Sequence, residues 1–328
     1  MAGQRRTTAR FTALPAKAGH YESFYIKACH PSERLGLWIR HTVHKRPGEA
    51  PQGSLWFTLF DGEPSAVKET LADVGAGDDE YIHIGASTLG FGTAVGRAEG
   101  EGRSASWELT FESAEEPLFH LPRDWMYRAP VPRTKLLSPY PDARFSGRAS
   151  FGDRDVELDG WRGMIGHNWG AEHAERWIWT HGADFEEDAG AWFDGGLGRI
   201  KLGPVTTPWI ANAVLFLDGE RHRLGGPEKA RRTEVDERPD GATFTLPGKD
   251  LTLQGTVGAA REAFVGWIYA DPDGSEHHTV NCSASDMTLT VSRPGEGART
   301  LTAKGAAAYE LGMREKDHGM AIQPFGDG

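Results

Sequence analysis

The sequence predicts an all-β protein, because short runs of alternating apolar and polar residues recur from end to end, separated by turn residues. Asp-Gly pairs at 61–62, 218–219, 240–241 and 273–274 favour tight hairpins. This patterning is typical of antiparallel strands in sandwiches or barrels. The clearest runs are 23–28, 36–40, 54–60 and 106–111 in the first half, and 176–180, 213–217, 242–246, 251–254 and 287–291 in the second.

Helical signals are few. The two best lie near Ser65–Asp73 and Pro227–Thr233, and both are short. No repeat of short period is visible, which argues against propellers and solenoids.

A proline-rich segment divides the chain. Residues 121–140 read LPRDWMYRAPVPRTKLLSPY, and Pro141 follows directly. Proline cannot donate a hydrogen bond to a strand ladder, so we expect an ordered connector here instead of sheet. The sequence therefore predicts two domains, residues 1–140 ending in the connector and residues 141–328.

Composition excludes several classes of protein. The net charge of −11 argues against binding to nucleic acid or, by charge, to an anionic membrane surface. No apolar window is long enough for a transmembrane helix, and the basic start of the chain lacks the apolar core of a secretory signal. Two cysteines, Cys29 and Cys282, do not form a disulfide framework and fit a reducing cytosol, so a cytoplasmic location is expected.

The richest stretch in chemical terms is GHNWGAEHAERWIWTHG at residues 166–182. His167 and Trp169 are two residues apart, so on a strand they share one face. A polar ring beside a large apolar ring suits a ligand pocket, although a buried histidine that bonds a backbone carbonyl explains the pattern equally well. The segment AEHAE at 171–175 is expected to be a loop.

The strand at 176–185 is expected to form a hairpin with 190–199 around a turn at 186–189. If Phe185 pairs with Gly190, then His181 faces Asp194. Trp177, Trp179, His181, Trp192 and Asp194 would then line one face, an arrangement that a slip of one residue would destroy.

This face has a possible chemistry. A carboxyl group buried among Trp rings has its charged form disfavoured, so its pKa is expected to rise and Asp194 could donate a proton near neutral pH. The faces of nearby Trp rings can stabilise a developing cation. The alternative is a structural His–Asp hydrogen bond inside a barrel, which residue types alone favour.

Other chemistries lack their motifs. The spacing of His167, His173 and His181 is not that of a zinc site, and the adjacent pair His277-His278 is expected on a solvated loop. Phosphate-loop, dinucleotide-binding and hydrolase-elbow motifs are absent. No metal and no cofactor are therefore predicted.

The segments GWRGMIGHNWG (160–170) and RWIWTHG (176–182) resemble the signature of carotenoid 1,2-hydratases and AttH-like proteins, which group with tocopherol cyclases and the lipocalin-like fungal Diels–Alderases. SPYP (138–141), VKE (67–69) and AAYELGMREKDHG (307–319) support the resemblance. It implies two consecutive lipocalin-like (calycin) β-barrel or half-barrel domains, large apolar ligands of isoprenoid or polyketide origin, and reactions that need no redox cofactor.

The resemblance also implies which residues react. A His-x-Trp element and, one hairpin later, an aromatic-x-Asp element match His167, Trp169, Trp192 and Asp194. Trp192 departs from the pattern, because a tyrosine is expected there. Its absence removes a phenol that could relay a proton, and this counts against hydration.

We therefore expect a cofactor-free enzyme that cyclises, isomerises or hydrates a hydrophobic terpenoid or polyketide-type molecule. Asp194 is the expected acid, with His167 and His181 as its catalytic partners, and Trp169, Trp177, Trp179 and Trp192 bind substrate. One alternative is a non-catalytic carrier of a hydrophobic ligand. Another is a sugar-acting β-sandwich enzyme with paired carboxylates in an open groove.

Overall fold

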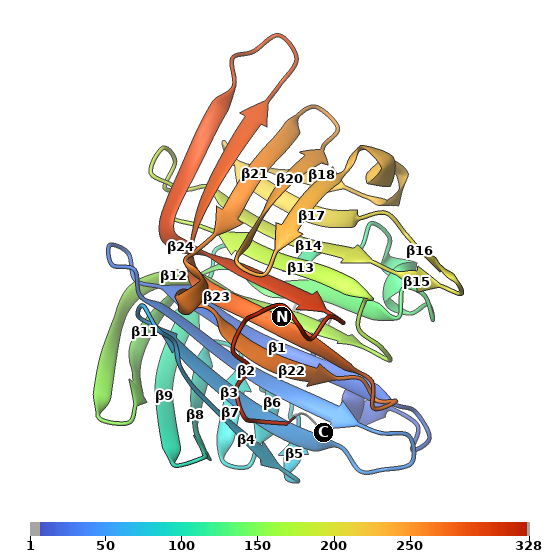
Figure 1. The fold of residues 1–328 in the computed structure, drawn as a ribbon. Helices are drawn as coiled ribbons and strands as arrows, with labels where there is room; N and C mark the ends of the chain where they lie inside the picture. The colour runs from blue at the N-terminus through green and yellow to red at the C-terminus, as the bar shows by residue number, and fades with distance from the viewer. Residues whose placement is uncertain (1–6, 327–328) are drawn as a thin grey trace.

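The computed structural model describes residues 7–326, which form two large antiparallel sheets (Figure 1). Sheet A has 12 strands in the order β4-β3-β2-β1-β12-β11-β9-β8-β7-β6-β5, with β10 paired to β11. It curves into a nearly closed barrel, because β4 packs against β8 and β9. Its strands are β1 (His20–Cys29), β2 (Gly36–Lys45), β3 (Gln52–Phe60), β4 (Ser65–Leu71), β5 (Val74–Gly75), β6 (Glu80–Ile84), β7 (Ser87–Gly90), β8 (Thr93–Gly100), β9 (Arg103–Glu112), β10 (Leu118–Phe119), β11 (Thr134–Phe151) and β12 (Arg154–Gly170).

Sheet B has 10 strands in the order β18-β17-β14-β13-β24-β23-β21-β20-β19, with β22 paired to β23. A separate two-stranded sheet joins β15 (Lys201–Leu202) to β16 (Val205–Thr206). The strands of sheet B are β13 (Arg176–Gly182), β14 (Trp192–Arg199), β17 (Ile210–Leu217), β18 (Glu220–Gly225), β19 (Glu234–Arg238), β20 (Gly241–Pro247), β21 (Thr252–Gly258), β22 (Val265–Ala270), β23 (Glu276–Ser292) and β24 (Arg299–Met313).

The predicted all-β class is confirmed, and among residues 7–326 helix is limited to short 3₁₀ segments. These are η2 (Phe11–Ala13), η3 (Asp124–Tyr127), η4 (Pro227–Arg232) and η5 (Arg261–Ala263). The helical prediction near 227–233 is confirmed as η4, whereas the one near 65–73 is wrong, because β4 pairs along β3 there. Across residues 7–326, no helix has the length and apolar character needed to cross a membrane.

The proline-rich segment is only partly a connector. Residues 121–133 contain no strand, but β11 begins at Thr134 and runs through Pro139 and Pro141. The pairing of β11 with β12 shifts register on both sides of Tyr140, so both prolines lie where the ladder is interrupted. The division into domains at 140 and 141 stays a prediction. The sheets themselves change later in the chain, since β12 ends in sheet A at Gly170 and β13 begins in sheet B at Arg176.

Strand β1 separates two buried environments. Its even-numbered residues Phe24, Ile26 and Ala28 belong to the core inside sheet A. Its odd-numbered residues face sheet B: Tyr25 packs edge-on against Trp179, and Lys27 Nζ donates to the Ala306 carbonyl at 2.7 Å. This alternation follows from the period of two along a strand.

The outer face of sheet A is covered by one end of sheet B. Figure 1 shows β22 and β23 lying across β1, β2 and β3. The contact is aromatic: Trp267 of β22 packs against Trp38 and Trp56, with ring centroids 6.3 and 5.0 Å away. Buried side chains therefore continue from one sheet into the other.

Close backbone approach holds β12 against β1, and Gly163 makes it possible. A Cβ atom at Gly163 would lie 1.8 Å from the Lys27 carbonyl oxygen. We expect Gly163→Ala to lower the free energy of unfolding by roughly 1–3 kcal/mol or more, as overpacking does. Urea unfolding followed by Trp fluorescence measures this. Gly297→Ala is the control, because no atom lies within 4 Å of its added Cβ, and equal effects of the two variants would contradict the prediction.

Candidate active site

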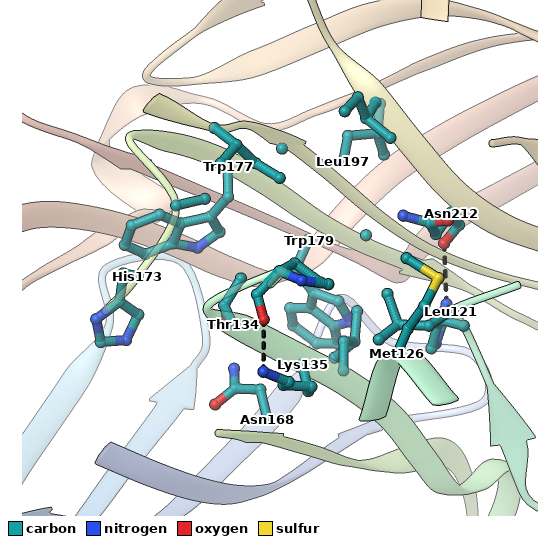
Figure 2. A pocket seen from close by; sticks show the side chains of 18 of the residues that line it. Leu121, Met126, Thr134, Lys135, Asn168, His173, Trp177, Trp179, Leu197 and Asn212 are labelled. Carbon is teal, nitrogen blue, oxygen red and sulfur yellow. Dashed lines mark hydrogen bonds between the residues drawn. The ribbon is translucent and has the colours of Figure 1, made fainter. Parts of the chain in front are cut away.

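A cavity of about 610 Å³ lies between the two sheets (Figure 2). β1, β2, β11 and β12 contribute from sheet A, β13, β14, β17 and β24 contribute from sheet B, and the proline-rich segment closes one side. Most lining side chains are apolar or aromatic, including Tyr25, Trp38, Leu121, Trp125, Met126, Val131, Leu136, Trp177, Trp179, Leu197 and Ile210. A mainly apolar cavity with a few polar groups suits an apolar small molecule.

The predicted hairpin is confirmed where it matters for this cavity. His181 pairs with Asp194, and Trp179 pairs with Gly196. Near the turn the prediction is wrong, since Phe185 bridges Asp188 instead of Gly190. The alternate residues Ile178, Phe193 and Leu197 belong to the core of sheet B, and Ile178 and Leu197 also border the cavity. Trp177 and Trp179 line the cavity from the predicted shared face.

Asp194 is buried behind the cavity wall and is not part of its lining. Its Oδ2 atom accepts a hydrogen bond from Ser138 Oγ at 2.5 Å and lies 3.2 Å from His120 Nε2. Burial by itself would raise the pKa of this carboxyl, but the charge and hydrogen bond of His120 outweigh burial and lower the pKa below its ordinary value. The expectation of a raised pKa is therefore wrong, and Asp194 is a carboxylate.

His120 connects Asp194 to the cavity, which its ring lines. Its Nδ1 atom lies 2.9 Å from the Asn212 carbonyl oxygen, and its Nε2 atom faces Asp194. Both ring nitrogens thus face acceptors, an arrangement that a doubly protonated ring satisfies. Sequence reasoning missed His120, because it follows β10, 74 residues before its carboxylate partner.

His181 supports the group formed by Asp194, His120 and Ser138, but its side chain does not line the cavity. Its Nε2 atom lies 3.0 Å from the Pro141 carbonyl oxygen. Burial, helped by the charge of Lys27, lowers its pKa to about 3, so its ring is neutral at ordinary pH. His181 therefore donates to Pro141 and fixes the bulged part of β11 beside Ser138.

His167 and Trp169 are not brought together with Asp194. His167 stacks on Phe24, inside sheet A, with its Nε2 atom 2.7 Å from Glu22 Oε1. Trp169 stacks on His167 and Tyr127. Since Phe24 points into sheet A and Tyr25 into the cavity, the His-x-Trp element lies on the other side of the sheet from Asp194.

Trp192 is also buried away from the cavity, stacked on Phe216. The cavity nevertheless contains a phenol, supplied by Tyr25 from β1. Gly166, the first residue of GHNWG, makes room for it, because a Cβ atom there would lie 2.0 Å from Tyr25 Cζ. Burial, followed by the negative charges of Asp194 and Glu310, raises the pKa of Tyr25 well above its ordinary value, so the phenol keeps its proton.

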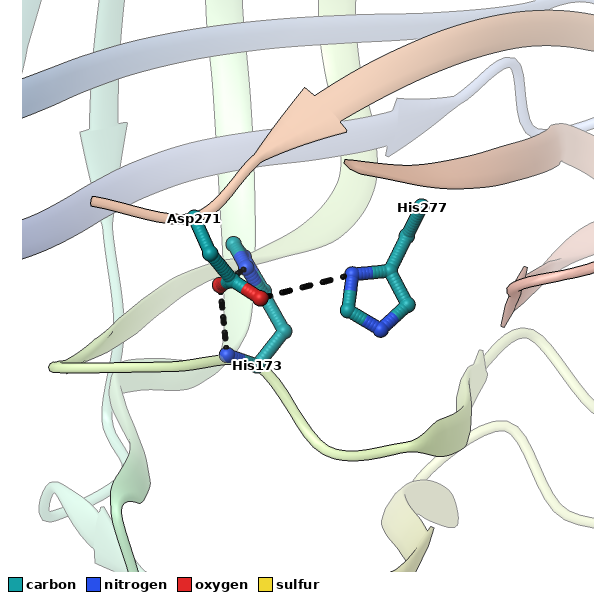
Figure 3. A group of neighbouring side chains, drawn as sticks. All are labelled: His173, Asp271 and His277. Atoms are coloured by element: carbon teal, nitrogen blue, oxygen red, sulfur yellow. Dashed lines mark hydrogen bonds and ion pairs between the residues drawn. The ribbon is translucent and has the colours of Figure 1, made fainter. Parts of the chain in front are cut away.

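A second histidine–carboxylate group borders the cavity (Figure 3). His173 lines it, with its Nδ1 atom 2.7 Å from Asp271 Oδ1, and stacks on Tyr21 with centroids 3.7 Å apart. His277 Nδ1 lies 3.7 Å from Asp271 Oδ2. The prediction of a solvated His277 is wrong, since the residue is fully buried at the start of β23. Burial lowers its pKa to about 3, so the ring is neutral.

This cluster was missed because its members lie in the loop 171–175 and in the β22–β23 hairpin, about 100 residues apart in sequence. One ligand atom from each of the three residues lies within 4.8 Å of the others, so His173, Asp271 and His277 are residues that could hold a divalent cation. Arg314 Nη2 lies 3.8 Å from Asp271 Oδ2 and already supplies positive charge there.

No family model matches the chain. An uncharacterised protein of Mycobacterium tuberculosis, found in strains CDC 1551 / Oshkosh and ATCC 25618 / H37Rv, is 26% identical over 321 residues and covers 93% of this chain and 91% of its own.

Solved structures give the fold. CghA with Sch210972 is 12% identical with a TM-score of 0.58, over 90% of this chain and 88% of that one. Kievitone hydratase from Nectria haematococca is 7% identical with a TM-score of 0.55, over 93% and 95%. A putative AttH from Nitrosomonas europaea aligns over 94% and 97% at 13% identity, with a TM-score of 0.49. The TM-scores to CghA and kievitone hydratase show a shared fold, and the predicted all-β architecture of two consecutive lipocalin-like sheets is confirmed.

The Asp271 carboxylate predicts a measurable acid dependence. Burial opposes its ionisation, but hydrogen bonds from His173 outweigh burial and lower its pKa from 3.8 to about 2. A depressed pKa stabilises the fold above the unfolded-state value, and that stability is lost as pH falls through the folded-state value. We expect Asp271→Asn to cost on the order of 2 kcal/mol at neutral pH and the two proteins to converge near pH 2.

Denaturant unfolding across this pH range measures the difference. Asp155→Asn, at an exposed position of β12, is the control and should run parallel to the wild type. A constant offset between Asp271→Asn and the wild type from neutral pH to pH 2 would contradict the assignment.

Proposed function

We propose that this chain is an enzyme that binds an apolar small molecule between its two sheets and cyclises, isomerises or hydrates it by proton transfer, without a redox cofactor. The observation that carries the proposal is a mainly apolar cavity whose wall contains His120, backed by the buried carboxylate of Asp194. A terpenoid or polyketide-type molecule has the size and apolar character that such a cavity selects.

His120 is the proposed general acid. Asp194, with Ser138, holds the ring and stabilises its charged form, while the Asn212 carbonyl accepts from Nδ1. The proton that passes to the substrate is the one on Nδ1, which the Asn212 carbonyl holds at the cavity wall. The Nδ1–H bond breaks as the new bond to the substrate forms, the ring keeps its Nε2–H toward Asp194, and Asp194 remains ionised throughout. This retains the predicted importance of Asp194 but changes its role, because a carboxylate with a lowered pKa positions and stabilises an acid instead of being one.

Tyr25 and the Trp rings are proposed to handle the charge that protonation creates. Trp177 and Trp179 line the same cavity as His120, and the face of a Trp ring attracts a developing cation. Tyr25 keeps its proton and packs against Trp179, so its hydroxyl can orient a water molecule or a substrate oxygen. The phenol of Tyr25 can take the role of the tyrosine that is absent at position 192, so hydration is again among the proposed reactions.

His173 is the proposed proton acceptor. When Nδ1 donates to Asp271, the tautomer that results has its lone pair on Nε2, and Nε2 has no hydrogen-bond partner among the described residues. A histidine oriented by a carboxylate is the usual arrangement of a general base. An acid and a base that border one cavity complete the proton balance of an isomerisation, a cyclisation or a hydration.

Kinetics of three variants test the assignment. His120→Gln, Asp194→Asn and His173→Gln should each lower kcat by about 100-fold or more, since proton transfer by a positioned group contributes on this scale. KM should change little, because the apolar walls remain. The substrate is first recovered from the purified protein by native mass spectrometry, and turnover is then followed by liquid chromatography with mass spectrometry.

His30→Gln is the matched control, because His30 contacts Trp161 outside the cavity, and it should keep wild-type kcat. Wild-type kcat in both His120→Gln and Asp194→Asn would overturn the role of this pair.

Two alternatives remain distinguishable. A non-catalytic carrier would show a thermal shift with the recovered ligand but would yield no product by mass spectrometry. A sugar-acting enzyme requires paired carboxylates in an open groove. Glu310 is the only acidic side chain among the described residues that line the cavity, and the walls are apolar, so the sugar reading has little support.

A further inference from the structure

The cavity contains a buried positive charge that no carboxylate contacts. Arg40 of β2 lines the cavity and is only 4% exposed. None of the ion pairs within 4.0 Å among residues 7–326 includes it. Guanidinium groups are almost never fully buried unless paired, because removing the charge from water is costly. The absence of a contacting partner therefore requires an explanation.

The hydrogen bonds of Arg40 leave most of its donors unused. Nε donates to Ser23 Oγ at 2.6 Å, and Nη1 is buried without a partner. An arginine has five N–H donors in a planar fork that matches two oxygens of one carboxylate. Within residues 7–326 only the Nε bond is formed, so the fork is free to bind a ligand.

The ring contacts of Arg40 fix the guanidinium in place. Its Cζ atom lies 3.8 Å from the centroid of the Tyr269 ring and 5.4 Å from that of Trp56. Rigid stacking keeps the donors oriented at low entropic cost when a ligand arrives. The side chain is thus a preorganised donor group in an otherwise apolar cavity.

Glu310 is the acidic side chain that faces the same cavity, and it does not neutralise Arg40 by contact. Its oxygens accept hydrogen bonds from three neutral donors, Trp177 Nε1 at 3.0 Å and both Tyr269 Oη and Asn281 Nδ2 at 3.2 Å. The carboxylate is therefore already satisfied by the protein, whereas the guanidinium is not. Lys135 also lines the cavity, and its Nζ donates to the Pro132 carbonyl at 2.5 Å. Arg40 is thus the charged group whose donors are left to recognise a ligand.

We propose that Arg40 is an oxyanion subsite, and that the ligand of this cavity is an apolar molecule that ends in a carboxylate or an equivalent acidic oxygen. This rests on the proposed function, whose substrate class it narrows. The apolar part of the ligand lies against Trp177 and Trp179, and its anionic head pairs with the Arg40 fork. The acidic group sets the position of the molecule relative to His120 and His173.

Three probes with one alkyl chain and different heads test the subsite: dodecanoate, dodecan-1-ol and dodecylammonium. Isothermal titration at mildly alkaline pH should show dodecanoate binding about tenfold tighter than dodecan-1-ol or more, since hydrogen bonds to charged groups are worth this much. Dodecylammonium should bind no tighter than the alcohol. In Arg40→Met the preference for the carboxylate should vanish, while the affinity for dodecan-1-ol stays within a factor of about two.

Arg34→Met is the control, because Arg34 is exposed, pairs with Asp286 at 2.7 Å and does not line the cavity; it should keep the preference. Three results would overturn the subsite and leave the proposed enzyme function standing. These are equal binding of dodecanoate and dodecan-1-ol to the wild type, tightest binding of dodecylammonium, and a preference for dodecanoate that survives Arg40→Met. Failure of all three probes to bind the wild type would overturn the subsite together with the apolar-ligand cavity. Arg40→Gln is the second variant if Arg40→Met does not fold, and the same loss of preference is expected there, since Lys135, which also lines the cavity, is unchanged in both.

Discussion

The two faces of β1 organise this molecule. Because successive side chains point to opposite sides of a strand, Phe24 and Ile26 enter the core of sheet A while Tyr25 and Lys27 meet sheet B. The outer face of sheet A is thereby committed to protein contact, and the cavity forms where the two sheets and the proline-rich segment fail to fill the space between them. Because sheet A is packed on both faces, the space for a ligand lies at its boundary with sheet B.

Buried ionisable groups occur in pairs on both sides of this boundary. Glu22 with His167 lies inside sheet A, Asp194 with His120 behind the cavity, and Asp271 with His173 beside it. Each carboxylate is kept ionised by hydrogen bonds that outweigh the cost of burial. Of these three histidines, His120 and His173 line the cavity and His167 does not, so position in the fold, and not residue type, distinguishes the pairs.

Sequence patterns predicted the parts that depend on local periodicity. Alternation predicted the strands, and the register of His181 with Asp194 followed from the length of one hairpin. The patterns could not predict contacts that form between distant strands. Tyr25 of β1, Ser138 of β11 and His120, which directly follows β10, reach the neighbourhood of Asp194. The error about β4 has the same origin, since its strand state depends on pairing with β3.

The case of Asp194 shows why this limit matters for chemistry. A carboxyl group surrounded by Trp rings is expected to be a proton donor, because desolvation favours its neutral form. One histidine and one hydroxyl, both invisible to local sequence reasoning, reverse that outcome. Arg40 is the converse case: its sequence context is an ordinary strand, and only the absence of a contacting partner in the folded cavity gives it meaning. In both cases the partners that the fold brings to a charged group determine what that group can do. Asp194 receives its partners from the protein, whereas the partner of Arg40 is left for a ligand to supply.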